Sequence, residues 1–195
     1  MDEDLEFVTL CQRGEIDAFR PLVEKHQKKM VNIAYRMLGD YDAACEVVQD
    51  AFFQAYKAIR KFRGEARFST WLCRIVINLS KNRIRQMKTR LEREGVSLDA
   101  PIETEEGQVP HDPPAQAPSV LEQMERKEVQ TAVQLCINAL DDEYREVIVL
   151  RDIQGLSYDE IGEILKIPGG TVKSRLFRAR DALKEGLKKV LGERL

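Results

Sequence analysis

The placement of proline divides this chain more decisively than any other sequence feature. Five of the seven prolines lie between residues 101 and 118, together with four acidic residues. Proline has no backbone N–H and charged side chains do not build a core, so this stretch is typical of an extended linker. We therefore expect three segments in the 195-residue chain: an N-terminal unit over 1–93, a flexible linker over 94–120 and a C-terminal unit over 121–195.

Both units have apolar residues at helical intervals. The N-terminal unit is expected to hold helices over about 16–38, 41–59 and 70–87, the last capped by Ser69 or Thr70. The C-terminal unit is expected to hold a long helix over about 121–140, a second over 142–152 and two shorter helices. Few Val, Ile and Thr residues alternate, so we predict an all-α fold of two small helical domains with essentially no sheet.

The last two helices have the pattern of a helix-turn-helix. Ser157 precedes Glu160 by three residues, which is the signature of a capping box at a helix start. Pro168, Gly169 and Gly170 predict a tight turn, after which Thr171 opens the final helix. A short helix, a glycine-containing turn and a second helix together indicate a DNA-binding motif.

Net charge is nearly balanced over the chain, with 31 basic and 33 acidic residues, but it is strongly segregated. Residues 60–93 contain 11 basic and 2 acidic side chains, and residues 166–195 contain 9 and 3. The segments 94–120 and 121–165 are acidic. Two basic blocks suit a polyanionic partner. The overall net charge of −2 does not reveal these blocks, because the acidic segments offset them.

The final helix can be divided into an apolar and a polar face. Val172, Leu176, Ala179 and Leu183 form the apolar stripe. Arginine reads guanine edges and lysine neutralises phosphate, so the polar face suits a major groove, although a merely solvated face is the simpler alternative. The candidate DNA contacts are Thr171, Lys173, Ser174, Arg175, Phe177, Arg178 and Arg180.

The third N-terminal helix and the loop before it combine cations, amides and aromatic rings. Cations bind a sugar-phosphate backbone, asparagine can pair with a base edge, and rings can stack on an unpaired base. The candidate contacts are Phe62, Arg63, Arg67, Phe68, Ser69, Arg74, Asn78, Lys81, Asn82 and Arg85. Core packing is an equal alternative for Phe62 and Phe68, and it is the favoured interpretation for Trp71.

Acidic side chains recur on the second helix at Asp42, Glu46 and Asp50, a spacing that places them on one face. Such a stripe could hold a divalent ion in a nuclease, but no general base or further oxygen ligand follows. A basic protein partner is the better interpretation. We expect no enzyme activity, no cofactor, no metal and no small-molecule substrate, and we expect the four cysteines to be reduced, mostly core residues.

No apolar run approaches the roughly 18 residues of a membrane span, and the acidic start differs from a secretory signal. We therefore expect a cytoplasmic protein.

Two ordered strings carry a family resemblance. They are DAACEVVQDAFFQAYKAIRKFRGEARFSTWLCRIVINLSKNRIR and, after the linker, LSYDEIGEILKIPGGTVKSRLFRARDALK. Together they resemble the extracytoplasmic-function (ECF) class of bacterial RNA polymerase sigma factors. The resemblance implies a sigma-two domain that binds the polymerase clamp and opens the minus-ten element, and a sigma-four domain that binds the minus-thirty-five element. It also implies core RNA polymerase, promoter DNA and an anti-sigma factor, often membrane-anchored, as partners.

The resemblance also assigns roles to residues. It implies clamp binding for Asp42, Glu46, Gln49 and Asp50, and minus-ten reading for Asn78 and Asn82. It implies base capture for the loop from Phe62 to Ser69, and minus-thirty-five recognition for the final helix. The alternative is a stand-alone helix-turn-helix regulator, which would bind a palindromic site as a symmetric dimer.

Overall fold

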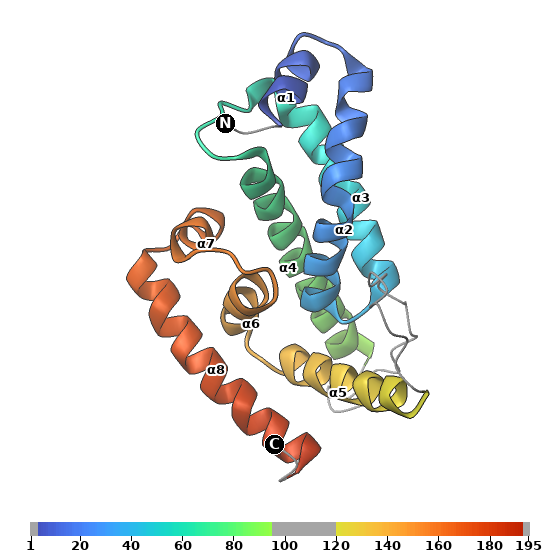
Figure 1. Ribbon diagram of the computed structural model, residues 1–195, viewed down its shortest axis with the longest axis vertical. Coiled ribbons are helices and arrows are strands. Elements are labelled where there is room, and N and C mark those ends of the chain that lie inside the picture. Colours follow the sequence, from blue (N-terminus) through green and yellow to red (C-terminus); the bar gives the residue numbers. More distant parts are fainter. Residues whose placement is uncertain (1–3, 95–119, 193–195) are drawn as a thin grey trace.

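The computed structural model describes residues 4–94 and 120–192, and every regular element in those residues is helical (Figure 1). The N-terminal unit contains α1 (Leu5–Gln12), η1 (Ile16–Ala18), α2 (Phe19–Leu38), α3 (Tyr41–Ala58), η2 (Ile59–Lys61) and α4 (Phe68–Glu94). The C-terminal unit contains α5 (Val120–Asn138), α6 (Asp142–Ile148), the π-helical turn η3 (Val149–Ile153), α7 (Tyr158–Leu165) and α8 (Gly169–Leu191). The all-α prediction is confirmed, while the expected linker falls, at residues 95–119, outside the described residues.

Packing of α2, α3 and α4 along one another forms the body of the N-terminal unit (Figure 1). Their apolar faces supply fully buried side chains such as Leu22, Ile33 and Leu72. Three of the four cysteines are buried and none is paired, as expected from their small apolar side chains. Burial raises the pKa of Cys73 to about 12, so this thiol is kept neutral and unreactive. In the described part of the chain, no helix is both long enough and apolar enough for a membrane span.

The turn between α2 and α3 consists of two residues, Gly39, which ends α2, and Asp40, which precedes α3. Gly39 ends α2 in the left-handed region, at φ 76°, where a side chain would be strained. Asp40 then caps α3, because its carboxylate accepts a hydrogen bond of 2.6 Å from the backbone N–H of Ala43. This turn is short enough to place α3 beside α2.

The helix-turn-helix begins as predicted. Ser157 and Glu160 form the capping box of α7, with the Glu160 N–H donating to Ser157 Oγ at 3.2 Å and the Ser157 N–H donating to Glu160 Oε2 at 2.9 Å. The last helix starts earlier than predicted, at Gly169 rather than Thr171, because the Pro168 carbonyl already accepts from the N–H groups of Thr171 and Val172. Gly169 and Gly170 therefore belong to the first turn of α8.

Two N-terminal boundaries also differ from prediction. Helix α1 was not expected, since its short apolar pattern follows an acidic start. Helix α4 begins at Phe68, where the N–H of Trp71 already donates to the Arg67 carbonyl at 3.0 Å. Thr70 is buried inside the first turn, so neither Ser69 nor Thr70 is the residue that precedes the helix.

The two units pack on each other around Arg145 of α6, which is only 6% exposed. Its guanidinium donates to the carbonyls of Ile137 at 3.1 Å and Leu140 at 3.0 Å, and also to that of Asn138. A further bond of 3.0 Å reaches the Met37 carbonyl in the N-terminal unit. One side chain thus satisfies the ends of both α5 and α2, whose last carbonyls have no partner within their own helices.

Replacing Arg145 with Met should lower the free energy of unfolding by on the order of 3 kcal/mol, because hydrogen bonds to charged groups contribute about 1.5–3 kcal/mol each and several buried carbonyls lose their donor. Urea unfolding followed by circular dichroism measures this change. The exposed Arg20 provides a matched Arg→Met control, which should shift stability by less than about 0.5 kcal/mol. Equal stability of the two variants would contradict the role assigned to Arg145.

Candidate nucleic-acid and polymerase interface

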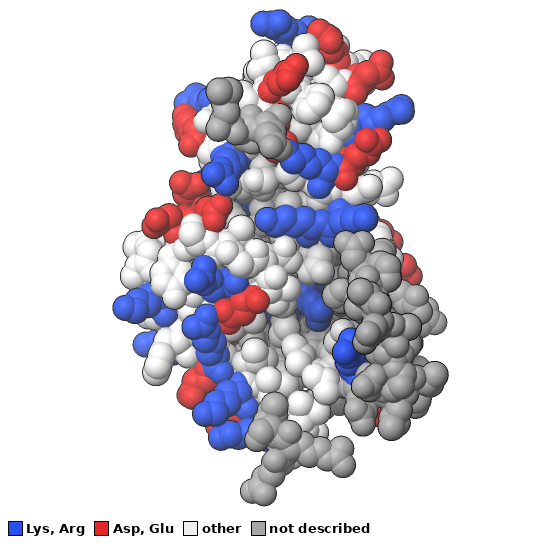
Figure 2. Space-filling view, viewed as in Figure 1, with Lys and Arg blue, Asp and Glu red and all other residues white. Residues whose placement is uncertain are grey.

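The outer face of α8 is polar and accessible. Val172, Leu176 and Ala179 are buried against the rest of the C-terminal unit, which agrees with the predicted apolar stripe. Lys and Arg side chains gather along α8 on the molecular surface (Figure 2). The side chains of Lys173, Ser174, Phe177 and Arg178, in the first turns of α8, are exposed. Phe177 is 77% exposed, so its ring has no structural task in the unit.

Two of the predicted α8 contacts have protein partners within the C-terminal unit. Arg175 Nη2 lies 2.7 Å from Glu143 Oε2 of α6, and Arg180 donates to both carboxylate oxygens of Asp152, at 3.0 and 2.5 Å. Asp152 raises the pKa of Arg180 through this bidentate pair. Arg175 and Arg180 therefore hold α8 against α6 and η3, whereas Lys173 and Arg178 form no ion pair with residues 4–94 or 120–192.

Helix α4 also has a buried and a polar face. Leu72 and Val76 are buried, while Asn78, Asn82 and Arg85 are exposed. Two other predicted contacts of α4 are directed towards the C-terminal unit. Arg74 Nη2 donates to the Glu163 carbonyl at 2.6 Å, and Lys81 Nζ lies 2.7 Å from Glu146 Oε1. The structure thus brings part of the predicted nucleic-acid face of α4 against α6 and α7.

The loop before α4 ends in an aromatic cluster. The rings of Phe62, Phe68 and Trp71 lie with their centroids 4.9–6.2 Å apart, and His26 packs on Phe68 at 5.7 Å. Phe68 is fully buried, so the expectation that its ring offers a stacking surface is not met in this structure. Phe62 and Trp71 are half-buried, and Arg63 and Arg67 are exposed. Phe62 is therefore the loop ring that remains accessible at an edge.

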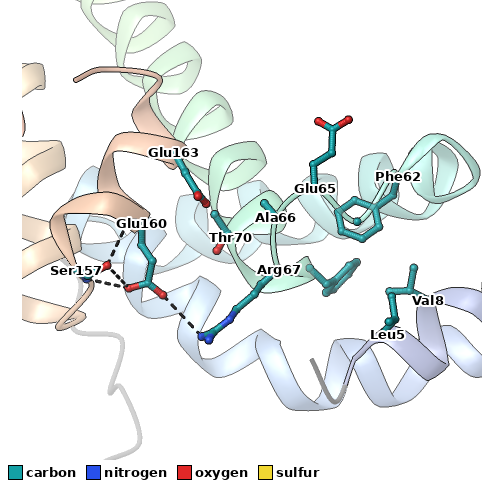
Figure 3. Close-up of a pocket in the computed structure, with 12 residues that line it drawn as sticks. Leu5, Val8, Phe62, Glu65, Ala66, Arg67, Thr70, Ser157, Glu160 and Glu163 are labelled. Atoms are coloured by element: carbon teal, nitrogen blue, oxygen red, sulfur yellow. Dashed lines mark hydrogen bonds and ion pairs between the residues drawn. The ribbon is translucent and has the colours of Figure 1, made fainter. Parts of the chain in front are cut away.

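An open pocket of about 720 Å³ lies beside this loop, between the two units (Figure 3). Phe62, Arg67 and Thr70 line it from the N-terminal unit, and Ser157 and Glu160 line it from the start of α7. The Arg67 guanidinium points across it to Glu160 Oε1 at 3.9 Å. Glu65 and Glu163 also line the pocket, so its ring, guanidinium and hydroxyls lie beside three carboxylates.

The acidic face of α3 lies opposite its buried side. Val47, Val48 and Ala51 are buried. The predicted polymerase contacts Asp42, Glu46, Gln49 and Asp50 are all exposed. Glu46 also accepts from Arg83 of α4 at 2.9 Å, an exposed ion pair that contributes little to stability. The stripe is therefore available to a basic partner.

Sequence reasoning missed a buried carboxylate, Asp4, beneath the aromatic cluster. Asp4 Oδ2 lies 2.8 Å from His26 Nε2, and Asp4 Oδ1 accepts from Lys25 at 2.8 Å. Burial on its own raises the pKa of Asp4, but the bonds from Lys25 and His26 outweigh it and hold the pKa below 3.8. Nothing in the sequence indicated that Asp4 is buried, since an acidic residue in an acidic segment is normally solvated. The pair ties α1 to α2 and positions the imidazole against Phe68.

Two family profiles match the chain. The Sigma-70 region 2 profile matches residues 22–90, which include most of α2, all of α3 and most of α4. The Sigma-70, region 4 profile matches residues 130–183, which include the helix-turn-helix. Both candidate faces, on α4 and on α8, lie within these matched segments.

Curated relatives are similar over nearly their whole length. The chain is 35% identical to the RNA polymerase sigma-H factor of Pseudomonas aeruginosa, over 98% of this chain and 97% of that protein. It is 40% identical to the ECF RNA polymerase sigma factor SigW of Bacillus subtilis, over 91% and 92%. Among solved structures, CnrH in complex with the cytosolic domain of CnrY superposes with a TM-score of 0.66 at 26% identity, covering 95% of this chain and 97% of that one.

Proposed function

The chain belongs to the ECF class of RNA polymerase sigma factors, and from this we propose how its described surfaces serve promoter recognition. The acidic face of α3 binds the clamp of core polymerase, α4 and its preceding loop read and open the minus-ten element, and α8 reads the minus-thirty-five element. The observation that carries the proposal is that α4 and α8, one in each matched segment, both present polar faces backed by buried apolar stripes.

The protein has no catalysis of its own in this proposal, because core polymerase supplies the phosphoryl transfer. It acts in the cytoplasm, and its domains follow the sequence boundaries 1–93, 94–120 and 121–195. A regulatory protein partner, an anti-sigma factor, is supported by the structural likeness to CnrH, which was solved with the cytosolic domain of CnrY bound. A stand-alone regulator is the weaker hypothesis, since it does not explain why residues 22–90 match Sigma-70 region 2.

Run-off transcription tests the proposal directly. Core polymerase with this chain should start transcripts at discrete positions on a library of genomic fragments, and core polymerase alone should not. Binding of the chain to a palindromic duplex as a dimer, with no transcription from any fragment, would favour the stand-alone regulator instead.

Replacing Lys173 or Arg178 with Ala should weaken minus-thirty-five binding without unfolding the protein, because both side chains point away from the buried stripe of α8. Loss of a base-edge contact costs about 1–3 kcal/mol and relaxes specificity, whereas loss of a phosphate contact reduces the salt slope by about one. Fluorescence anisotropy with holoenzyme and labelled duplex measures both. Lys184→Ala, on an exposed later turn of α8, is the matched control. Unchanged affinity and salt slope in both variants would contradict the proposal that α8 binds in the major groove.

Reversing the acidic face of α3, with Asp42, Glu46 and Asp50 changed to Lys, should abolish association with core polymerase. All three side chains are exposed, so the fold should persist while like charges repel a basic partner. Co-purification with tagged core polymerase reports the loss. Reversal of the exposed Glu6, Asp17 and Glu24 changes the net charge equally and should leave binding intact. Equal binding by both triple variants would refute the clamp assignment.

Strand opening should depend on Asn78 and Phe62. The amide of Asn78 is exposed on α4 and the ring of Phe62 borders the pocket, so both gain contacts only when a base leaves the duplex. Stacking contributes roughly 1–3 kcal/mol per base. Ala variants should bind promoter normally but show reduced permanganate reactivity of promoter thymines.

A template with a pre-melted bubble provides the control for strand opening, since it should restore transcription by these variants. Normal melting of duplex promoter by both variants would exclude the base-capture role.

A further inference from the structure

Helix α1 lies outside both matched family segments, yet its contacts support the two ends of the loop that leads into α4. The region 2 match begins at residue 22, whereas α1 ends at Gln12. The loop covers residues 62–67, and its first residue, Phe62, belongs to the proposed minus-ten contacts. Helix α1 packs on η2, from which this loop leaves (Figure 1).

The last residue of α1, Gln12, binds the start of the loop. Its Nε2 donates to the carbonyl of Ile59 at 3.1 Å and to that of Phe62 at 2.8 Å. Ile59 opens η2 and Phe62 follows its last residue, so one amide group joins α1 to both ends of this short helix. The carbonyl oxygen of Phe62 lies in the peptide plane that contains its own Cα, so holding it restricts the backbone that carries the ring.

The other end of α1 supports the end of the loop. Asp4, which precedes α1, is 3% exposed, and its Oδ2 lies 2.8 Å from Nε2 of His26 on α2. The imidazole of His26 packs on Phe68, the first residue of α4, with the ring centroids 5.7 Å apart. The Asp4 carboxylate therefore orients the imidazole against which Phe68 packs.

Apolar side chains of α1 lie between these two attachments. Leu5 and Val8 line the pocket of about 720 Å³ together with Phe62 and Phe68, and Figure 3 shows both beside Phe62. Val8 is 2% exposed, so its side chain is part of the core beneath the loop. Polar and apolar contacts of α1 thus converge on the same segment.

The middle of the loop contributes little to its own conformation. Residues 63–65 are exposed, and Gly64 has a left-handed φ of 70°. Few buried contacts are typical of a segment with low local stability. The conformation of the loop therefore depends on how its two ends are held.

We propose that α1 is a positioning element for strand opening: Gln12 and the Asp4–His26 pair hold the loop so that Phe62 is in place before an unpaired base reaches it. Ordering the loop in advance removes the conformational cost of ordering it during base capture. Gln12 and Asp4 do not contact nucleic acid in this proposal, because each acts through the loop. The inference rests on the proposed role of the loop in opening the minus-ten element.

The fluorescence of Trp71 reports on the loop, because Trp71 is the only tryptophan in the chain and its ring centroid lies 4.9 Å from that of Phe62. Gln12→Glu keeps the size of the side chain and removes its N–H donors. In the full chain, this variant should show stronger acrylamide quenching and a red shift of the emission, since the Phe62 ring would no longer shield the indole. Gln27→Glu, on the exposed face of α2, adds the same charge and should change neither. Unchanged quenching in Gln12→Glu would overturn the proposal.

A lysine variant separates hydrogen bonding from packing. Gln12→Lys keeps a donor at this position and should retain the quenching of the parent. If Gln12 only filled space, Gln12→Glu would be the milder change, because Glu has the shape of Gln. Circular dichroism confirms that each variant is folded. Equal quenching of the Glu and Lys variants would overturn the role assigned to the amide.

The second attachment is tested with Asp4→Ala. The ring of Phe68 lies 5.8 Å from that of Trp71, so loss of the carboxylate behind His26 should also increase the quenching of Trp71. Asp17→Ala, at an exposed position in η1, removes the same charge and is the matched control. Quenching of Asp4→Ala like that of the parent would overturn the role of the Asp4–His26 pair.

Promoter melting connects the loop to function. On duplex promoter, holoenzyme with Gln12→Glu should bind normally and show about threefold or lower permanganate reactivity of promoter thymines, the effect expected when one or two hydrogen bonds no longer hold the loop. A template with a pre-melted bubble should restore transcription.

The variant Phe62→Ala distinguishes failure of this inference from failure of the proposed function. If Phe62→Ala reduces melting while Gln12→Glu releases the loop and melts promoter like the parent, the positioning role of α1 is overturned and the function of the loop stands. If Phe62→Ala also melts promoter normally, the role of the loop is overturned, and this inference with it.

Discussion

The packing of the two units on each other depends on the hydrogen bonds that the buried guanidinium of Arg145 donates to backbone carbonyls. Burying a guanidinium is unfavourable unless its donors are satisfied, and burial accordingly lowers the pKa of this group. Carbonyls at the end of α5 supply most of its partners, and the Met37 carbonyl at the end of α2 supplies another. The same side chain therefore fixes the α5–α6 corner and joins the two units, so the C-terminal unit cannot leave α2 without leaving part of this network unpaired.

The junction between the two units also explains part of the segregation of charge along the sequence. The acidic segment 121–165 and the basic segment 60–93 do not simply flank a linker, because Glu146 and Lys81 meet at the interface between units. The second basic segment is treated differently: Arg175 and Arg180 are paired inside the C-terminal unit, while Lys173 and Arg178 stay exposed on α8. Each basic segment is thus partly paired within the protein and partly exposed, the first through contacts between units and the second through contacts within one unit.

Sequence patterns succeeded where the cause is local and failed where it is tertiary. The Ser157–Glu160 box, the end of α2 at Leu38 and the apolar stripe of α8 all follow from patterns within a few residues. The burial of Phe68 does not, because it depends on His26 and on the Asp4 carboxylate behind it. The start of α8 at Gly169 was missed because glycine is a poor helix former, whereas the Pro168 carbonyl fixes the first turn. Contacts between the two units could not be predicted, because they join residues that are far apart in the sequence.

The geometry also separates the acidic face of α3 from the junction between the two units. The acidic face of α3 is exposed, and α3 lies on the side of the N-terminal unit away from α7 and α8 (Figure 1). A partner that binds this face of α3 would therefore not have to displace the C-terminal unit. Separation of the two units would break ion pairs of Arg67 and Lys88 that are mostly exposed and contribute little. It would also break the buried contacts of Glu146 and Arg145, which contribute more. Opening requires only that the partners bind the separated units more tightly than the joined ones.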